Sequence, residues 1–224
     1  MIRGAASLAA GAVACILLNV DGVITATVVE SPDAVLSGIS RFELFGHGVG
    51  TCLIVVTACL VGGLKRHQQG LLWGAAFGGG ILASLAKVFF VRPRPFLYLS
   101  DQAETTLSTV FHGGSVSGFL EHIRNSHLQS FPSAHTAAAF GLAVALGKVA
   151  PQGRRWWLFL AAGCGLQRLF AQKHFASDVL AGAAIGLFWA QLMVWLMSRL
   201  NIDRSGFSVV RSGAGSEFRL RRAA

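Results

Sequence analysis

Long apolar segments with few charged residues dominate this sequence and constrain the fold more than any other feature. Of its 224 residues, 53% are hydrophobic and 13% are charged, and the mean hydropathy is +0.58. Soluble domains usually carry about a quarter charged residues, so the deficit and the apolar runs together indicate an integral membrane protein. The apolar segments of helical length are residues 5–29, 49–64, 71–91, 132–150, 155–171 and 177–200. The sequence therefore predicts an all-α, polytopic membrane protein with six transmembrane helices in a bundle.

The polar segments divide the chain into a membrane domain and a tail. The first apolar run continues well past Cys15, which favours an uncleaved helix over a signal peptide, and Asp21 within it is expected to face other helices or interfacial water. Residues 30–47 read as a connecting loop with a short interfacial helix. We predict a six-helix transmembrane domain over residues 1–200. Residues 201–224 are then a basic Gly/Ser/Arg-rich cytoplasmic tail, expected to be disordered.

The basic residues predict the orientation in the membrane. With six helices, one side of the membrane collects Arg3, Lys65, Arg66, Lys148, Arg154, Arg155, Arg199 and the arginines of the tail. The positive-inside tendency makes that side cytoplasmic, together with both termini. In a bacterium this is an inner-membrane protein whose opposite face is periplasmic. The net charge of +9 is explained by this placement, and no zinc-finger, helix-turn-helix or RNA-binding pattern accompanies it, so we predict no nucleic-acid partner.

Two clusters of polar residues at the opposite face predict an anion site. Lys87 and Arg94 close the third apolar segment, and FPSAHT, residues 131–136, opens the fourth. Ser133 in that motif is a good N-cap residue. A helix N-terminus offers unpaired N–H groups and the positive end of a dipole, which favour a phosphate. His135 lies in the same first turn and brings a titratable group to this position.

A third cluster, QRLFAQKHFASD at residues 167–178, adds groups that could perform chemistry. His174 and Asp178 are four residues apart, so they share one face if the next helix begins here. The aspartate could hold one imidazole nitrogen and leave the other free to attack or to accept a proton. Arg168 adds a fixed cation that could bind an oxyanion. Because no convergent carboxylates for magnesium and no HExxH motif are present, we predict no metal and no cofactor.

The three clusters together resemble the type 2 phosphatidic acid phosphatase superfamily, whose pattern is KxxxxxxRP, PSGH and SRxxxxxHxxxD. They stand here as KVFFVRPRP at residues 87–95, PSAH at 132–135 and QRLFAQKHFASD at 167–178. Two positions depart from the pattern: Ala134 replaces a glycine and Gln167 replaces a serine. Since the arginine of the pattern is the one directly before Pro95, we interpret Arg92 as an ordinary flanking charge and keep Gln167 outside the catalytic core.

The resemblance implies a mechanism and a substrate class. His174 would attack phosphorus and form a phosphohistidine, oriented by Asp178, and His135 would protonate the leaving lipid oxygen and later activate water. The phosphoryl oxygens would be held by Lys87, Arg94, Ser133, Ala134 and Arg168. The implied partner is a phosphorylated membrane lipid, such as phosphatidic acid, phosphatidylglycerophosphate, undecaprenyl pyrophosphate or a lipid A phosphate. Headgroup selectivity would lie in the loop of residues 97–130.

Three alternatives remain open. A phosphotransferase would pass the phosphoryl group to a second lipid through the same phosphohistidine. A transporter or channel would use the intramembrane charges to line a path, but it gives no reason for the spacing of the three motifs. A peroxidase would use the same pocket with bound vanadate, because vanadium haloperoxidases share this pattern.

Overall fold

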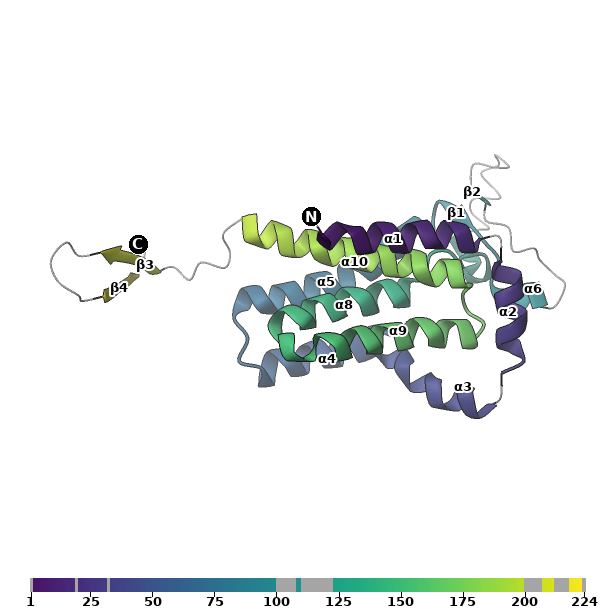
Figure 1. Ribbon diagram of the computed structural model, residues 1–224, viewed down its shortest axis with the longest axis horizontal. Helices are drawn as coiled ribbons and strands as arrows, with labels where there is room; N and C mark the ends of the chain where they lie inside the picture. Colours follow the sequence, from purple (N-terminus) through teal and green to yellow (C-terminus); the bar gives the residue numbers. More distant parts are fainter. Residues whose placement is uncertain are drawn as a thin grey trace.

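Long helices lie side by side and form an elongated bundle (Figure 1). The computed structural model describes residues 2–18, 20–31, 33–99, 108–109, 123–199, 207–211 and 218–222. Its long helices are α1 (Ile2–Leu17), α4 (Gly48–Val61), α5 (Arg66–Ala86), α8 (Ala134–Val149), α9 (Arg154–Phe170) and α10 (Ala176–Arg199). Its shorter elements are α2 (Asp21–Val29), α3 (Asp33–Ser40), η1 (Arg41–Phe45), β1 (Phe90–Val91), α6 (Pro95–Leu99), β2 (Ser108–Thr109), η2 (Ser126–Leu128), η3 (Pro151–Gly153), β3 (Phe207–Arg211) and β4 (Phe218–Arg222). Helix α8 packs against α5, α9 and α10, and α1 covers α10.

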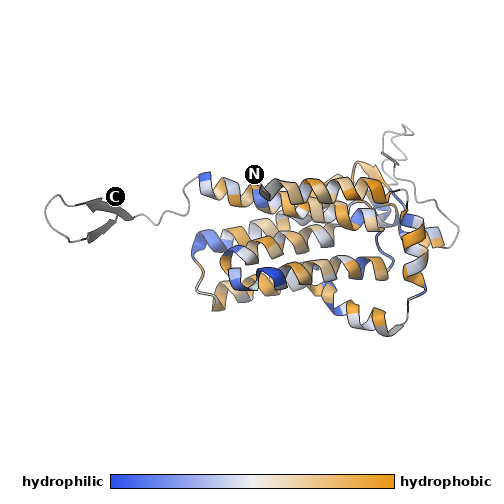
Figure 2. Ribbon diagram, viewed as in Figure 1, coloured by the Kyte–Doolittle hydropathy of each residue, from blue (hydrophilic) through white to orange (hydrophobic). Residues whose placement is uncertain are grey.

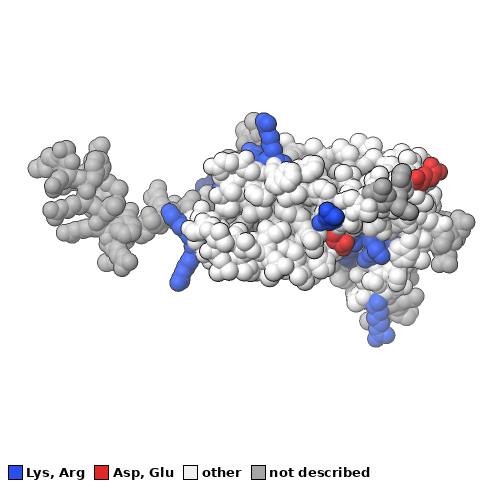
Figure 3. Space-filling model, turned by 90° about the horizontal axis from the view of Figure 1, so that it is seen from below, with Lys and Arg blue, Asp and Glu red and all other residues white. Residues whose placement is uncertain are grey.

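The bundle has the surface of a membrane protein, in agreement with the predicted all-α membrane fold, whereas the count of six spans is not confirmed. Apolar residues run along all the long helices (Figure 2), and on the face drawn in Figure 3 charged side chains are few and most of the surface is uncharged. Among the described residues, α5 and α10 are each long and apolar enough to cross a membrane. Up to two more spans arise if the bent pairs Ala5–Leu17 with α2, and Val35–Phe45 with α4, each count as one. Helix α8 is apolar but shorter, with 16 residues.

The prediction of one straight helix over residues 5–29 is wrong. The chain breaks between α1 and α2, which are bent by 84° relative to each other, so α2 runs across the end of the bundle (Figure 1). Asp21 begins α2 and is fully buried, where it accepts hydrogen bonds from the backbone N–H and hydroxyl of Ser177 at the start of α10. A buried carboxylate needs such partners, and the bend brings Asp21 to them. Asp21 thus faces another helix, as the sequence suggested.

The remaining boundaries differ from the prediction mainly at α5. This helix begins at Arg66 rather than Leu71 because the side chain of Gln68 caps the backbone N–H of Lys65, which makes the expected polar turn the first turn of the helix. It ends at Ala86, five residues earlier than expected, and β1 follows, paired antiparallel with β2. The predicted loop over residues 30–47 contains α3 and η1.

The described residues of the tail beyond α10 form a short paired segment, and the disorder predicted for residues 201–224 stays a prediction. Strands β3 and β4 form an antiparallel ladder beyond the end of α10 (Figure 1). Phe207, Val209, Val210, Phe218 and Leu220 give these short segments the residues that strands favour. The cytoplasmic location of the tail stays a prediction.

Small residues let α5, α8 and α10 approach closely. A Cβ atom added to Gly141 of α8 would lie 2.2 Å from the carbonyl oxygen of Ala75 in α5. A Cβ atom added to Gly182 of α10 would lie 2.3 Å from the carbonyl oxygen of Ser133, directly before α8. Since small residues are what allow helix backbones to touch in membranes, these glycines fix the distance between the helices. Gly182 thereby fixes the start of α10 against the start of α8.

Replacing Gly182 by alanine is expected to lower the free energy of unfolding by about 1–3 kcal/mol, the usual cost of overpacking. The added methyl group meets backbone rather than a flexible side chain, so the two helices must move apart. Gly70→Ala in α5 is the matched control, because nothing lies within 4 Å of its Cβ position. That control should be stabilising by up to about 1 kcal/mol through helix propensity. Denaturant titration of both variants in detergent measures the difference, and equal effects would contradict the close approach.

Candidate active site

The three predicted clusters meet at one end of the bundle. The last turn of α5, the first turn of α8 and the connection between α9 and α10 all lie at this end (Figure 1). They carry the predicted site residues Lys87, Arg94, Ser133, Ala134, His135, Arg168, His174 and Asp178. Of the polar loop over residues 97–130, residues 100–107 and 110–122, where we predicted headgroup selectivity, lie outside the described residues.

His174 lies in the connection between α9 and α10 and is 3% exposed. Its Nδ1 atom lies 2.7 Å from the carbonyl oxygen of Ser130. A carbonyl oxygen only accepts hydrogen bonds, so Nδ1 carries the proton and Nε2 keeps its lone pair. Burial lowers the pKa of His174 to about 4, against the opposing effect of Asp178. The ring is therefore neutral at physiological pH, with a nitrogen available for nucleophilic attack.

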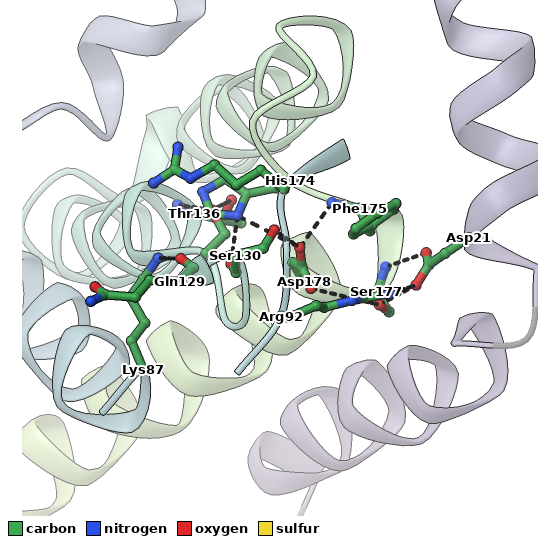
Figure 4. A network of polar contacts seen from close by, with 12 residues as sticks. Asp21, Lys87, Arg92, Gln129, Ser130, Thr136, His174, Phe175, Ser177 and Asp178 are labelled. Carbon is green, nitrogen blue, oxygen red and sulfur yellow. Dashed lines mark hydrogen bonds and ion pairs between the residues drawn. The ribbon is translucent and has the colours of Figure 1, made fainter. Parts of the chain in front are cut away.

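Asp178 supports this histidine by a different route from the direct contact with an imidazole nitrogen that the spacing suggested. Its Oδ2 atom is 3.7 Å from Nδ1 of His174, too far for a hydrogen bond. The same oxygen accepts hydrogen bonds from the hydroxyl of Ser130 and from the backbone N–H of Phe175 (Figure 4). Asp178 therefore holds Ser130, whose carbonyl oxygen in turn holds the imidazole, and its charge acts on the ring at a distance.

Arg92 is not the flanking surface charge that we predicted. It is fully buried, and its guanidinium donates hydrogen bonds to Asp178, to the hydroxyl of Ser177 at 2.7 Å and to Asp21 at 2.7 Å (Figure 4). The guanidinium also lies 4.2 Å from the centre of the Phe175 ring. Arg92 neutralises two buried carboxylates at once. The sequence held one signal for this: Asp21 interrupts an apolar segment, and such a carboxylate requires a buried cation.

The first turn of α8 is arranged as the sequence predicted. Ser133 is the N-cap, and its hydroxyl oxygen accepts hydrogen bonds from the backbone N–H of Thr136 at 3.4 Å and from its hydroxyl at 2.9 Å. Ala134 and His135 follow as the first residues of the helix, where backbone N–H groups have no partner within the helix. The turn therefore presents amide donors beside the imidazole of His135.

Two cations from the segment between α5 and α6 hold residues 126–129, which precede α8. The ammonium of Lys87 donates a hydrogen bond to the carbonyl oxygen of Gln129 at 2.6 Å, and the guanidinium of Arg94 donates one to that of Ser126 at 3.0 Å. Burial and the charge of the neighbouring Arg94 lower the pKa of Lys87 to about 8. Burial and the charge of Arg168 likewise lower the pKa of Arg94. The cations repel one another, which favours a bound anion between them.

Arg168 is held by Glu43, a residue that the sequence interpretation missed. Its Nη1 atom donates a hydrogen bond to the Glu43 carboxylate at 2.5 Å, and the side-chain amide of Gln167 donates to the other carboxylate oxygen at 3.2 Å. Gln167 thus supports the arginine from outside the reacting centre. Glu43 comes from η1, in a segment that we had assigned to a loop, and no motif in the sequence singles it out.

Two buried nitrogen atoms mark where a ligand would bind. Among the described residues, His135 Nε2 and Arg168 Nε are the buried side-chain nitrogen or oxygen atoms that lack a hydrogen-bond partner. Leaving a buried polar group unpaired is costly, by about 1–3 kcal/mol each. An anion with several oxygen acceptors would pair these atoms, and phosphate has that property. The arrangement is suited to binding a phosphoryl group beside a neutral histidine.

An apolar cavity of about 370 Å³ opens beside this position, between α4, α5 and α8. Its lining includes Phe77, Ile81, Leu85, Ala134, His135 and Ala138. Its polar end is therefore formed by the first turn of α8, and its walls are hydrocarbon and small residues. Such a cavity suits an apolar chain attached to a charged headgroup.

Comparisons with known proteins agree with this geometry. The sequence profile of the PAP2 superfamily matches residues 68–202. The chain is 32% identical to a lipid A 1-phosphatase of Porphyromonas gingivalis over 83 residues, which cover 35% of this chain and 19% of that protein. It is 28% identical to a lipid A 1-phosphatase of Rhizobium johnstonii over 123 residues, which cover 55% and 45% respectively. The matched segments thus span less than half of these relatives.

The fold also matches a solved structure. The crystal structure of a PAP2-type phosphatidylglycerolphosphate phosphatase from Bacillus subtilis superimposes with a TM-score of 0.55, covering 89% of this chain and 98% of that one. The sequence identity of 17% is low, so this likeness concerns the fold.

Proposed function

The chain belongs to the PAP2 superfamily, and on that premise we propose that it is an integral membrane phosphatase that hydrolyses a phosphomonoester or pyrophosphate of a lipid. The proposed reaction uses a phosphohistidine and no metal ion, at the periplasmic face of a bacterial inner membrane. The proposal rests chiefly on one observation: the neutral, buried His174 lies at the same end of the bundle as His135 Nε2 and Arg168 Nε, two buried nitrogen atoms without a hydrogen-bond partner. An anion could pair with both. The names of the matched relatives, which act on lipid phosphates, support the same substrate class.

The first step forms the phosphoenzyme. The free Nε2 lone pair of His174 attacks phosphorus, and the bond between phosphorus and the lipid oxygen breaks. His135 donates a proton to that oxygen as it leaves. Lys87, Arg94, Arg168 and the first amides of α8 bind the other phosphoryl oxygens, where negative charge is distributed in the transition state. Asp178 and the carbonyl oxygen of Ser130 keep the Nδ1 proton in place, which stabilises the positive charge that forms on His174.

The second step releases phosphate. Water attacks the phosphohistidine, its proton passes to His135, and the bond between phosphorus and Nε2 breaks. His135 is then protonated again and His174 is neutral, so the cycle closes without another reactant.

The apolar cavity supports a lipid rather than a soluble phosphate ester. A lipid whose headgroup occupies the phosphate position would extend its chain past His135 into the space between α4, α5 and α8. The burial of that chain would contribute binding energy that a short ester lacks.

The test is release of inorganic phosphate by the purified protein in detergent, with EDTA, from a panel of lipid phosphates. We expect release from at least one lipid at an unchanged rate in EDTA, and a phosphoenzyme whose phosphate is labile in acid and stable in alkali. Loss of activity in EDTA would contradict the metal-free route. Release that requires a second lipid, with phosphate found on it, would establish a phosphotransferase instead.

The pH dependence of kcat/KM should follow the protonation of the buried Lys87. Lys87 binds phosphate as a cation, and it is charged below its pKa of about 8 in the free protein. We therefore expect kcat/KM to be level below this pH and to fall above it, as the ammonium loses its proton. Lys87→Arg keeps the charge and should move the fall to higher pH. The exposed Lys65→Arg at the far end of α5 is the control, and a fall that does not move in Lys87→Arg would contradict the assignment.

A further inference from the structure

We propose that Glu43 is a positioning residue that compensates the positive charge of His135 while this histidine protonates the leaving oxygen, and that holds Arg168 in place for the phosphate. The inference rests on the proposed function and extends it to a residue outside the three motifs. Glu43 also lies outside the segment of residues 68–202 that the family profile matches. The Glu43 carboxylate does not contact the substrate in this proposal and acts through His135 and Arg168.

Close packing on both sides fixes η1, and with it Glu43. A Cβ atom added to Gly163 of α9 would lie 2.2 Å from the Phe42 ring, so that ring lies directly on the backbone of α9. On the other side, a Cβ atom added to Gly46 would lie 2.3 Å from the carbonyl oxygen of His135. Phe45 is buried as well. Phe42, directly before Glu43, and Gly46, three residues after it, thus contact α9 and α8, so the carboxylate has little freedom to move away.

The contacts of Glu43 leave one edge of Arg168 for the ligand. Glu43 binds the guanidinium through Nη1, and Gln167 accepts a hydrogen bond from the same Nη1 atom at 3.2 Å. The Nε atom is buried and unpaired. A guanidinium presents its donors in a rigid fork, so a carboxylate that holds Nη1 determines where Nε points. Phosphate would therefore bind at the Nε edge while Glu43 stays in place.

The Glu43 carboxylate also faces His135, the proposed general acid. Glu43 Oε1 lies 4.0 Å from Nε2 of His135. The other titratable groups that face this imidazole are His47 before α4, Arg168 of α9, His174 and Lys87, each cationic or neutral. A proton on His135 is thus opposed by burial and by the charges of Arg168 and Lys87, and Glu43 supplies a compensating negative charge 4.0 Å away. Such an attraction favours the protonated imidazole without requiring a hydrogen bond.

If Glu43 acts in this way, the effect of replacing it on kcat/KM should depend on the leaving group of the substrate. Departure of a lipid alkoxide requires protonation, whereas p-nitrophenolate leaves without it. Because kcat/KM covers the steps up to departure of the leaving group, it isolates the acid function from the later attack of water. The experiment measures kcat/KM of Glu43→Gln and of the unaltered protein with the lipid phosphate identified in the panel and with p-nitrophenyl phosphate.

We expect Glu43→Gln to lower kcat/KM about 10- to 100-fold with the lipid, since general acid catalysis contributes about 10²- to 10⁴-fold in total. With p-nitrophenyl phosphate the loss should be below about 3-fold, because that leaving group gains little from an acid and the glutamine side chain can still accept the hydrogen bond from Arg168 Nη1. Glu43→Asp keeps the charge and should recover part of the activity on the lipid. Glu30→Gln removes an exposed carboxylate of the same N-terminal segment and should match the unaltered protein on both substrates.

The outcomes separate the two proposals. Equal losses on both substrates, or Glu43→Asp no better than Glu43→Gln, would reduce Glu43 to a structural partner of Arg168 and overturn the inference. No loss in Glu43→Gln would overturn it as well. If the unaltered protein released phosphate from neither substrate, the proposed function itself would fail and this inference with it. A thermal unfolding curve for each variant excludes loss of the fold as the cause.

Discussion

His174→Ala is expected to abolish formation of the phosphoenzyme and to lower kcat for lipid phosphate hydrolysis by about 10⁴-fold or more, as loss of a nucleophile does in other enzymes that form covalent intermediates. No other described imidazole combines a proton fixed on one nitrogen with a neutral ring and a buried position beside the anion site. His135 cannot substitute for it, because the proposed reaction already requires His135 as the acid. The remaining cations would still bind the substrate, so KM should change much less than kcat.

Radiolabelled lipid phosphate measures this expectation directly. Rapid quenching in alkali should trap label on the unaltered protein and none on His174→Ala. His67→Ala at the opposite end of α5 is the matched control and should keep both the label and the turnover. If the turnover of His174→Ala stayed within about tenfold of that of the unaltered protein, the assignment of His174 as the nucleophile would be wrong. Label on His174→Ala would show that another residue accepts the phosphoryl group.

Arg92→Met is expected to be the most destabilising single substitution in this chain. It removes the cation that pairs with Asp21 and Asp178 and leaves two buried carboxylates uncompensated. Breaking a buried ion pair by removing one partner costs about 3–5 kcal/mol. The same change should lower activity, since Asp178 would lose the partner that fixes it beside Ser130 and the carbonyl oxygen that orients His174.

Unfolding in detergent, followed by circular dichroism, measures the effect. Arg41→Met removes an exposed arginine of η1 and should change stability by less than about 1 kcal/mol, the usual range for surface charges. Asp21→Asn alone should cost less than Arg92→Met, because it leaves no buried carboxylate unpaired. Combining the two should cost less than the sum of the single effects, since they remove one interaction. Additive effects, or an Arg92→Met loss no larger than that of Arg41→Met, would contradict the network.

The sequence by itself determined the class of protein and most of the candidate site. Hydropathy depends on local composition, so the apolar segments predicted a membrane protein whose long helices lie within two residues of their expected ends at α9 and α10. The N-cap at Ser133 was also predictable, because capping is a local interaction of residues three apart. Motif spacing then identified Lys87, His135 and His174 together, although the roles given to them stay predictions until the experiments above are done.

The tertiary structure decided which buried charges pair. Arg92 meets Asp21 across 71 residues of chain and Asp178 across 86, and Arg168 meets Glu43 across 125. Motif spacing separates Arg94 from Arg92 but does not show that Arg92 is buried, and nothing in the local sequence distinguishes Glu43 from a solvated acid. Their partners follow from how the helix ends converge, and so does the break between α1 and α2 that brings Asp21 into the bundle. Charged groups in a medium of low polarity must find partners, and only the three-dimensional arrangement of the segments determines which partners lie within reach.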